Sequence, residues 1–180
     1  MCGDVKMKLK GSKTEKNLQT ALQGEALAHL KYQFYKSQLG KTSKDIEEKL
    51  DEIIHNEKEH GKIWFKLLHE GQISSDEVNL RDAMTGENHE YIEMYPHFAK
   101  IAEEEGFSDI ARLFSGVAAI EGQHRDEFVN ILKSIENEEL FEDNKKIYWK
   151  CKNCGYVHFG YNSPEECPIC KHPQKYFVRD

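Results

Sequence analysis

The chain has 180 residues, which is enough for one well-filled domain and a small second one. With 38% hydrophobic and 32% charged residues it has a globular composition, and no apolar run approaches the roughly 20 residues of a membrane span. The net charge of −7 argues against nucleic acid, whose binding would require clustered Lys and Arg. No secretory leader opens the chain, so we expect a cytoplasmic protein that binds neither membrane nor nucleic acid.

The first half of the chain predicts two helices after a loose arm, residues 1–11. Ser12-Lys13-Thr14-Glu15 is a capping-box pattern, and helix-favouring sequence continues from there to Leu39. Thr42-Ser43 opens a second helix, which reaches Glu70 and is ended by Gly71. Residues 72–79 are polar and are expected to form a longer crossover.

The second half of the chain predicts two more helices, followed by a segment without helical periodicity. A third helix is expected from about Leu80 to Glu105, with Pro96 as a kink inside it, and a fourth from Ser108 to about Glu138. Two tight joints and one long crossover are typical of an all-α four-helix bundle. The sequence therefore predicts a bundle over residues 12–138, a charged linker over 139–146, and a small metal-bound β/loop domain over 147–180.

Two helices carry the same Glu-x-x-His pattern, Glu57 with His60 and Glu121 with His124. Residues three apart share a helix face, and both pairs fall inside the apolar stripe of their helix. Glu52 and His55 have the same spacing, but His55 lies roughly opposite the apolar stripe, so we exclude this pair as metal ligands. On the first helix, Glu25 lies on the apolar face among Leu18, Leu22 and Tyr32.

The third helix leaves its inward carboxylate open. Periodicity alone favours Glu87 first and Glu90 second, with Glu93 on the flank, although a kink at Pro96 could rotate these faces. A single Glu on an apolar stripe is usually a boundary residue that reaches solvent. Four helices that each carry such a Glu do not fit this explanation. Burying their carboxylates unpaired would cost on the order of several kcal/mol for each one. Two divalent cations would remove that cost, and mixed carboxylate and imidazole donors favour iron or manganese.

Four of the five cysteines form two pairs, Cys151-x2-Cys154 and Cys167-x2-Cys170. In a reducing compartment this spacing indicates a tetrathiolate metal site rather than disulfides. Spacing alone favours zinc over a single iron. A neighbouring two-metal redox site favours iron, because it needs electrons one at a time. Cys2 receives no role.

The order of these motifs resembles the rubrerythrin family over nearly the whole chain. The resemblance includes Gly11–Leu18, the Gly24-Glu25 pair, Glu57–His60, the stretch from His89 to Pro96, Glu121-x-x-His124, and the two cysteine pairs with Gly155-Tyr156-Val157-His158. It implies a ferritin-like di-iron bundle followed by a rubredoxin-like domain. It departs from free-standing rubredoxins in its short insert between the cysteine pairs and in Lys171, where a Gly often stands.

The resemblance also implies a function and its residues. It implies reduction of hydrogen peroxide by a non-haem di-iron peroxidase, in defence against oxidative stress, with electrons arriving through an iron held by four cysteines. The di-iron ligands that it implies are Glu25, Glu57, His60, Glu90, Glu93, Glu121 and His124, and the other iron has Cys151, Cys154, Cys167 and Cys170. It implies further that His60 gives way to Glu93 on oxidation, and it therefore favours Glu93 over Glu87.

Several expectations accompany this interpretation. Tyr32, seven residues after Glu25, either assists proton transfer or simply fills the core. The electron donor would be a rubredoxin or an NAD(P)H-dependent reductase, and the assembly a homodimer or larger homo-oligomer. The rival functions are a ferritin-class ferroxidase that handles iron, and a non-enzymatic helical module with a structural zinc ribbon.

Overall fold

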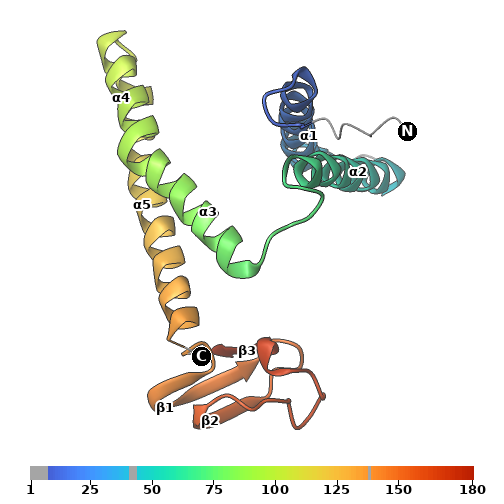
Figure 1. Ribbon diagram of the computed structural model, residues 1–180, viewed down its shortest axis with the longest axis vertical. Coiled ribbons are helices and arrows are strands. Elements are labelled where there is room, and N and C mark those ends of the chain that lie inside the picture. The colour runs from blue at the N-terminus through green and yellow to red at the C-terminus, as the bar shows by residue number, and fades with distance from the viewer. Residues whose placement is uncertain (1–7, 41–43, 138) are drawn as a thin grey trace, which may run out of the picture. The chain divides into compact units, whose positions relative to one another are not determined.

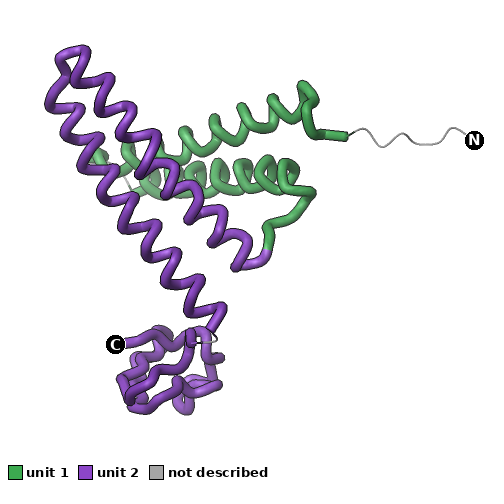
Figure 2. Tube along the Cα trace, turned by 60° about the vertical axis from the view of Figure 1, so that its left-hand side comes forward, with its two compact units in different colours: residues 1–74 green, residues 75–180 purple. Residues whose placement is uncertain are grey.

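The computed structural model describes residues 8–40, 44–137 and 139–180. It divides into two compact units, residues 1–74 and residues 75–180 (Figure 2). The expected helices and the small C-terminal strand domain are present, which confirms the predicted fold class. No helix among the described residues is long and apolar enough to cross a membrane.

Unit 1 is a hairpin of two helices, α1 (Lys13–Ser37) and α2 (Lys44–Leu68) (Figure 1). The Ser12 half of the capping box is confirmed, since Ser12 Oγ accepts from the N–H of Glu15 at 3.0 Å. The Glu15 carboxylate accepts from the N–H of Gly11, one residue before the position that the motif usually reaches. Thr42 and Ser43, expected to open the second helix, lie outside the described residues.

Unit 2 begins with a helical hairpin, and we call its first arm the rod. The rod consists of α3 (Asp76–His89), the π-helix η1 (Glu90–Met94) and α4 (Tyr95–Glu104), and α5 (Ser108–Glu136) packs along it (Figure 1). The turn between α4 and α5 contains Gly106 at φ 85°, a conformation that glycine adopts without steric cost.

The π-turn replaces the simple proline kink expected from the sequence. The backbone N–H of Tyr95 donates to the carbonyl of Glu90, five residues earlier, and Pro96 stands in the first turn of α4. Pro96 has no N–H, and its ring would clash with the carbonyl four residues before it in a regular helix. The wider turn relieves this conflict and shifts the helix face by about one residue. Side chains before and after η1 therefore do not follow one continuous stripe.

The C-terminal segment of unit 2 is a three-stranded antiparallel sheet with two loops (Figure 1). It contains β1 (Glu142–Cys151), β2 (Val157–Asn162), the 3-10 turn η2 (Gln174–Tyr176) and β3 (Phe177–Arg179), in the order β2-β1-β3. Its buried core consists of Trp149, Cys151, Cys167 and Phe177. Two of these four residues are expected metal ligands, so the core is too small to hold the segment together by burial alone.

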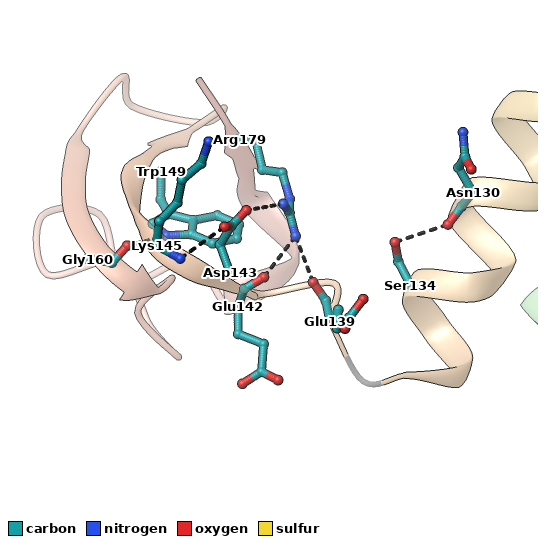
Figure 3. Close-up of polar contacts among 9 residues, drawn as sticks. All are labelled: Asn130, Ser134, Glu139, Glu142, Asp143, Lys145, Trp149, Gly160 and Arg179. Atoms are coloured by element: carbon teal, nitrogen blue, oxygen red, sulfur yellow. Dashed lines mark hydrogen bonds and ion pairs between the residues drawn. The ribbon is translucent and has the colours of Figure 1, made fainter.

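One arginine ties the start of β1 and the preceding loop to the sheet (Figure 3). The Arg179 guanidinium forms an ion pair with Asp143, whose side chain is only 14% exposed. It also donates to the carbonyl oxygens of Glu139, at 2.9 Å, and Glu142, at 2.8 Å, and its Cζ lies 5.4 Å from the centroid of the Trp149 ring. Asp143 is therefore paired rather than free in solvent, within the stretch expected from the sequence to be an exposed linker.

Candidate metal centres

The hairpin of α1 and α2 brings together three of the expected ligands. Nδ1 of His60 lies 3.1 Å from an Oε of Glu57 and 3.8 Å from an Oε of Glu25. The glutamate side chains are 25% and 19% exposed, for Glu25 and Glu57, and His60 is half exposed. The approach of the helices is close here, because a Cβ on Gly61 would contact the Cβ of Glu25 at 3.6 Å. We call Glu25, Glu57 and His60 the first cluster.

Two further side chains of this hairpin clarify its polar contacts. The Trp64 indole N–H donates to Oε1 of Glu25 at 3.4 Å, so Trp64 orients a candidate ligand. Trp64 lies four residues after His60 on the same face of α2, and a buried indole usually finds a polar partner. His29 Nδ1 lies 2.9 Å from the carbonyl oxygen of Ile54 and is a packed histidine. His55 is exposed.

Replacing Trp64 with Phe should weaken metal binding at the first cluster by about 10-fold, within the range for partners that orient a ligand. The ring volume is largely kept, but Glu25 loses its donor and becomes free to rotate. Anaerobic titration of ferrous iron into the metal-free protein would measure the change. An affinity equal to that of wild type, with helix content unchanged by circular dichroism, would contradict an orienting role.

The rod and α5 form a second cluster with the same composition, Glu87, Glu121 and His124. His124 Nδ1 lies 2.6 Å from an Oε of Glu121 and 3.6 Å from an Oε of Glu87. The side chains of Glu87 and Glu121 are 26% and 14% exposed. Among the described residues, the ligand atoms of each cluster lie within 4.8 Å of one another.

The other expected ligands on the rod lie elsewhere. Glu90 is half-buried and lies close enough to Tyr95 and Glu87 for its charge to act on both. Glu93 is 67% exposed and lies 3.3 Å from Nδ1 of His89 on the outside of the rod. Tyr32 is half-buried on α1, with its ring centroid 6.2 Å from that of Tyr35.

Negative charge accumulates around the second cluster. Burial, together with the hydrogen bond and charge of Glu121, raises the pKa of Glu87. The hydrogen bond to Glu121 raises the pKa of His124, although burial opposes this shift. Burial and the charges of Glu90, Glu121 and Glu87 raise the pKa of Tyr95. These carboxylates repel one another, and a bound cation would relieve that repulsion.

The four cysteines converge at the end of the sheet. The sulfur atoms of Cys151 and Cys170 are 3.7 Å apart, as are those of Cys154 and Cys167. A tetrahedral site with metal–sulfur bonds of about 2.3 Å requires sulfur atoms about 3.8 Å apart. The cage therefore already has the size of a tetrathiolate metal site. Burial opposes ionisation of Cys170, but the backbone N–H of His172 and the neighbouring thiols lower its pKa to about 6.

The two cysteine pairs end in matching turns, with one difference. The N–H of Gly155 donates to the carbonyl of Cys151 at 2.8 Å, and the N–H of Lys171 donates to that of Cys167 at 2.9 Å. Gly155 has φ 80° and Lys171 has φ 60°, so both occupy the left-handed region. A side chain in this region costs roughly 1–2 kcal/mol, and the exposed Lys171–Glu166 ion pair at 3.1 Å offsets little of it.

Replacing Lys171 with Gly should therefore stabilise the C-terminal domain by about 1 kcal/mol, because it removes that backbone strain. Thermal loss of the tetrathiolate absorption would measure the change. Lys152→Gly is the matched control, since Lys152 follows the first cysteine and its φ is not positive. That variant should lower stability through the greater entropy of its unfolded chain. Equal effects from both substitutions would show that Lys171 is not strained.

The donor sets fit the metals that they imply. Four thiolates at tetrahedral spacing suit iron or zinc, and each carboxylate–histidine cluster offers three oxygen and nitrogen donors around one point. Both Glu-x-x-His motifs supply donors from a single helix, as in di-iron carboxylate proteins.

Most of the chain matches known protein families. Residues 16–132 match the rubrerythrin family, and residues 149–178 match the rubredoxin-like domain of rubrerythrin. The chain is 40% identical to rubrerythrin of Nitratidesulfovibrio vulgaris, over 94% of this chain and 95% of that one. It is 39% identical to rubrerythrin of Porphyromonas gingivalis, over 97% and 93%, and 38% identical to rubrerythrin-1 of Clostridium acetobutylicum, over 94% and 95%.

A solved structure of nigerythrin in a partially reduced state aligns with all of this chain and 92% of its own, at 27% identity. Its TM-score of 0.37 is too low for comparing how the parts are arranged. The four-cysteine cluster thus lies in a rubredoxin-like iron domain, and the carboxylate–histidine clusters of di-iron type lie in the rubrerythrin region. Together the two matched segments and the relatives that align over nearly its whole length show that this chain belongs to the rubrerythrin family, whose members are oxidoreductases.

Proposed function

We propose that this protein is a non-haem iron peroxidase that reduces hydrogen peroxide to water. The observation that carries the proposal is the presence, in one chain, of two carboxylate–histidine clusters and one tetrathiolate cage of metal-binding size. Storage of iron does not require the cage, and a structural zinc ribbon does not require the carboxylates. Electron supply to a two-metal redox centre uses both.

The metal ligands that we propose for the di-iron centre are those that the family resemblance implies, and five of them belong to the two clusters. They are Glu25, Glu57, His60, Glu90, Glu93, Glu121 and His124, within a bundle domain over residues 12–138. The four cysteines would hold the remaining iron in a domain over residues 147–180. Iron held by the carboxylates and histidines would supply two electrons to the O–O bond, and iron held by the four cysteines would replace them one at a time.

Conversion of one peroxide to two waters also consumes two protons, and a tyrosine on the rod is suited to deliver them. Tyr95 is half-buried and lies close enough to Glu90, Glu121 and Glu87 to feel their charges, so its hydroxyl can hold a proton near the cluster. On the hairpin of α1 and α2, Tyr32 is half-buried and shares the helix face of Glu25. We propose that it donates protons at the first cluster in the same way. Half-burial of Glu57 and Glu121 limits the access of water to these two carboxylates.

We propose that the protein works as a homodimer or larger homo-oligomer and receives electrons from a rubredoxin or an NAD(P)H-dependent reductase. Both hairpins expose large apolar side chains, including Leu27 (59%), Phe34 (63%) and Leu113 (65%). Such surfaces are usually covered in the working assembly. Light scattering on the purified protein would give the mass, and a monomer at micromolar concentration would contradict this part of the proposal.

The decisive experiment is anaerobic and uses the iron-loaded, fully reduced protein. Peroxide and oxygen are added separately, and reoxidation of the tetrathiolate iron is followed by its visible absorption. A peroxidase is expected to show rapid reoxidation with peroxide and a much slower response to oxygen. A ferroxidase would oxidise added ferrous iron and accumulate it while the tetrathiolate iron stays reduced. A colourless protein with zinc in the cysteine cage would exclude the peroxidase, and a failure to oxidise added ferrous iron as well would exclude the ferroxidase.

A further inference from the structure

The connection between the two helical hairpins is short. Helix α2 ends at Leu68 and α3 begins at Asp76, so residues 69–75 alone join them. The sequence predicted a longer crossover over residues 72–79, with a third helix from about Leu80. The structure corrects this expectation, because α3 starts at Asp76 and takes up the second half of that segment.

Part of this connection is coiled and does not extend away from α2. The N–H of Gly71 donates to the carbonyl of Lys66 at 2.6 Å, and the N–H of Gln72 donates to that of His69 at 3.2 Å. Gly71 has φ 86°, in the left-handed region. These features form a turn that caps the end of α2. Residues 73–75 are therefore the part of the connection that is left to cover distance.

A ferritin-like bundle needs a connection that runs along its length at this point. Its second and third helices are joined by the one long crossover of the fold, which carries the chain from one end of the bundle to the other. A fully extended chain advances at most about 3.6 Å per residue. The steps from Gln72 to Asp76 therefore reach about 14 Å, and those from Leu68 would reach about 29 Å even with the capping turn pulled straight.

The positions of the clusters along their helices give the distance that is needed. Glu57 lies 11 residues before Leu68 at the end of α2, and Glu87 lies 11 residues after Asp76 at the start of α3. At a rise of 1.5 Å per residue, each of these glutamates is about 16.5 Å from that helix end. With both clusters at one height in a ferritin-like bundle, the two ends are about 33 Å apart along the axis, plus the sideways separation of the helices. Residues 69–75 are too short to cover this distance within one chain.

We propose that two copies of this chain exchange hairpins, so that each di-iron centre combines the first cluster of one copy with the second cluster of the other. This rests on the proposed function, because it requires the two clusters to form one centre. It goes beyond the proposed oligomer, because neither copy alone then holds a complete set of iron ligands. A hinge too short to close on its own chain favours such an exchange, since a second copy supplies the same hairpin with no connection to span.

Both hairpins have apolar surface for a helical partner of this kind. On the first, a groove of about 520 Å³ lies beside Glu25, and its lining includes Leu30 and Phe65. Leu30 is 48% exposed, so the hairpin does not cover this groove by itself. On the second, Phe98 and Ile110 line a cavity of about 290 Å³ and are 39% and 45% exposed. Burial of these side chains against another hairpin is favourable, because it removes apolar surface from water.

A bundle formed by a single chain requires a different helix order. In an up-and-down bundle the second and third helices are antiparallel, so a short connection is sufficient. That order departs from the ferritin-like fold and keeps all ligands of a centre within one chain. The two arrangements therefore differ in which chain supplies each cluster.

Complementation between two variants distinguishes these arrangements. His60→Ala damages the first cluster and His124→Ala the second, and the two variants are co-expressed with different affinity tags so that the mixed oligomer is purified through both. Upon anaerobic titration with ferrous iron, exchange predicts wild-type affinity at about half of the carboxylate–histidine centres, because one of the two centres in each mixed pair combines two unchanged clusters. Each variant purified alone should have no such centre. A mixed oligomer without wild-type centres, or a failure to form any mixed oligomer, overturns the proposal.

Lengthening the hinge gives a second test. Inserting about 12 Gly and Ser residues between Ile73 and Ser74 adds about 40 Å of extended reach, so that one chain can close its own bundle. We expect the wild-type centres of the mixed oligomer to become several-fold fewer, while the chain with the insertion and both histidines keeps its iron affinity. The same insertion after Gly40, between α1 and α2, leaves the hinge unchanged and should not affect complementation. Equal complementation with both insertions would overturn the role of the short hinge.

Neither experiment uses peroxide, so the two proposals fail separately. An exchanged bundle that binds iron but does not react with peroxide would reject only the proposed peroxidase function. Centres that form within one chain and react with peroxide would reject only the exchange.

Discussion

Replacing Cys167 with Ser should unfold the C-terminal domain and leave the helices intact. Cys167 is fully buried and is both a metal donor and one of only four residues in the core of the sheet. Apparent binding free energies of structural tetrahedral metal sites are about 10–16 kcal/mol, far more than so small a core can supply. Loss of the tetrathiolate absorption and of the near-ultraviolet dichroism of Trp149 would report unfolding, while far-ultraviolet dichroism reports the helices.

Cys2→Ser is the matched control for this substitution, because Cys2 stands outside the two cysteine pairs. It should leave colour, dichroism and protease resistance unchanged. Unfolding should also occur when a strong chelator removes the metal from wild type. If the Cys167 variant kept a folded sheet without metal, the domain would owe its stability to the Trp149 core and the Arg179 contacts instead.

Replacing His60 with Ala should lower peroxide turnover by at least about 100-fold, more than the loss expected for a partner outside the coordination sphere. His60 is the nitrogen donor of the first cluster, with Nδ1 at 3.1 Å from Glu57. Its side chain is about half exposed, so its removal leaves no cavity in a core and should not unfold the hairpin. Stopped-flow reoxidation of the reduced protein by peroxide would measure the loss.

The chain contains its own control for that experiment in His55. It lies on the same helix and follows Glu52 with the same spacing, but it is exposed and belongs to neither cluster. His55→Ala should keep wild-type kinetics. Equal losses in the two variants would indicate that α2 is simply sensitive to substitution, and unchanged kinetics in both would remove His60 from the site.

Local sequence rules were sufficient for most of the helices and for the cysteine cage. The capping box at Ser12 and Gly106 at φ 85° mark their ends where the structure has them, because both act through neighbouring backbone groups. The cage follows from two short turns whose hydrogen bonds lie within four residues. Periodicity also brought Glu57 and His60 onto one face, since α2 is a regular helix throughout.

The rod shows where such rules stop. Counting at 100° per residue assumes an uninterrupted α-helix, whereas Pro96 and the π-turn at Glu90–Met94 displace every later face. Glu87 precedes the π-turn, and periodicity identified its face correctly. Its approach to Glu121 and His124 depends on Tyr91 packing against Gly122, a contact between residues 31 positions apart that no local pattern encodes.

The sequence by itself therefore determined the kinds of metal donor, their grouping on helices and loops, and the family. Tertiary structure decided the rest, because it places Glu87, the glutamate on the rod that periodicity favoured first, beside Glu121 and His124 and leaves Glu93 outside. The physical reason is that donor type is a property of single residues, whereas the direction of a side chain within a π-turn, and the approach of one helix to another, are set by packing.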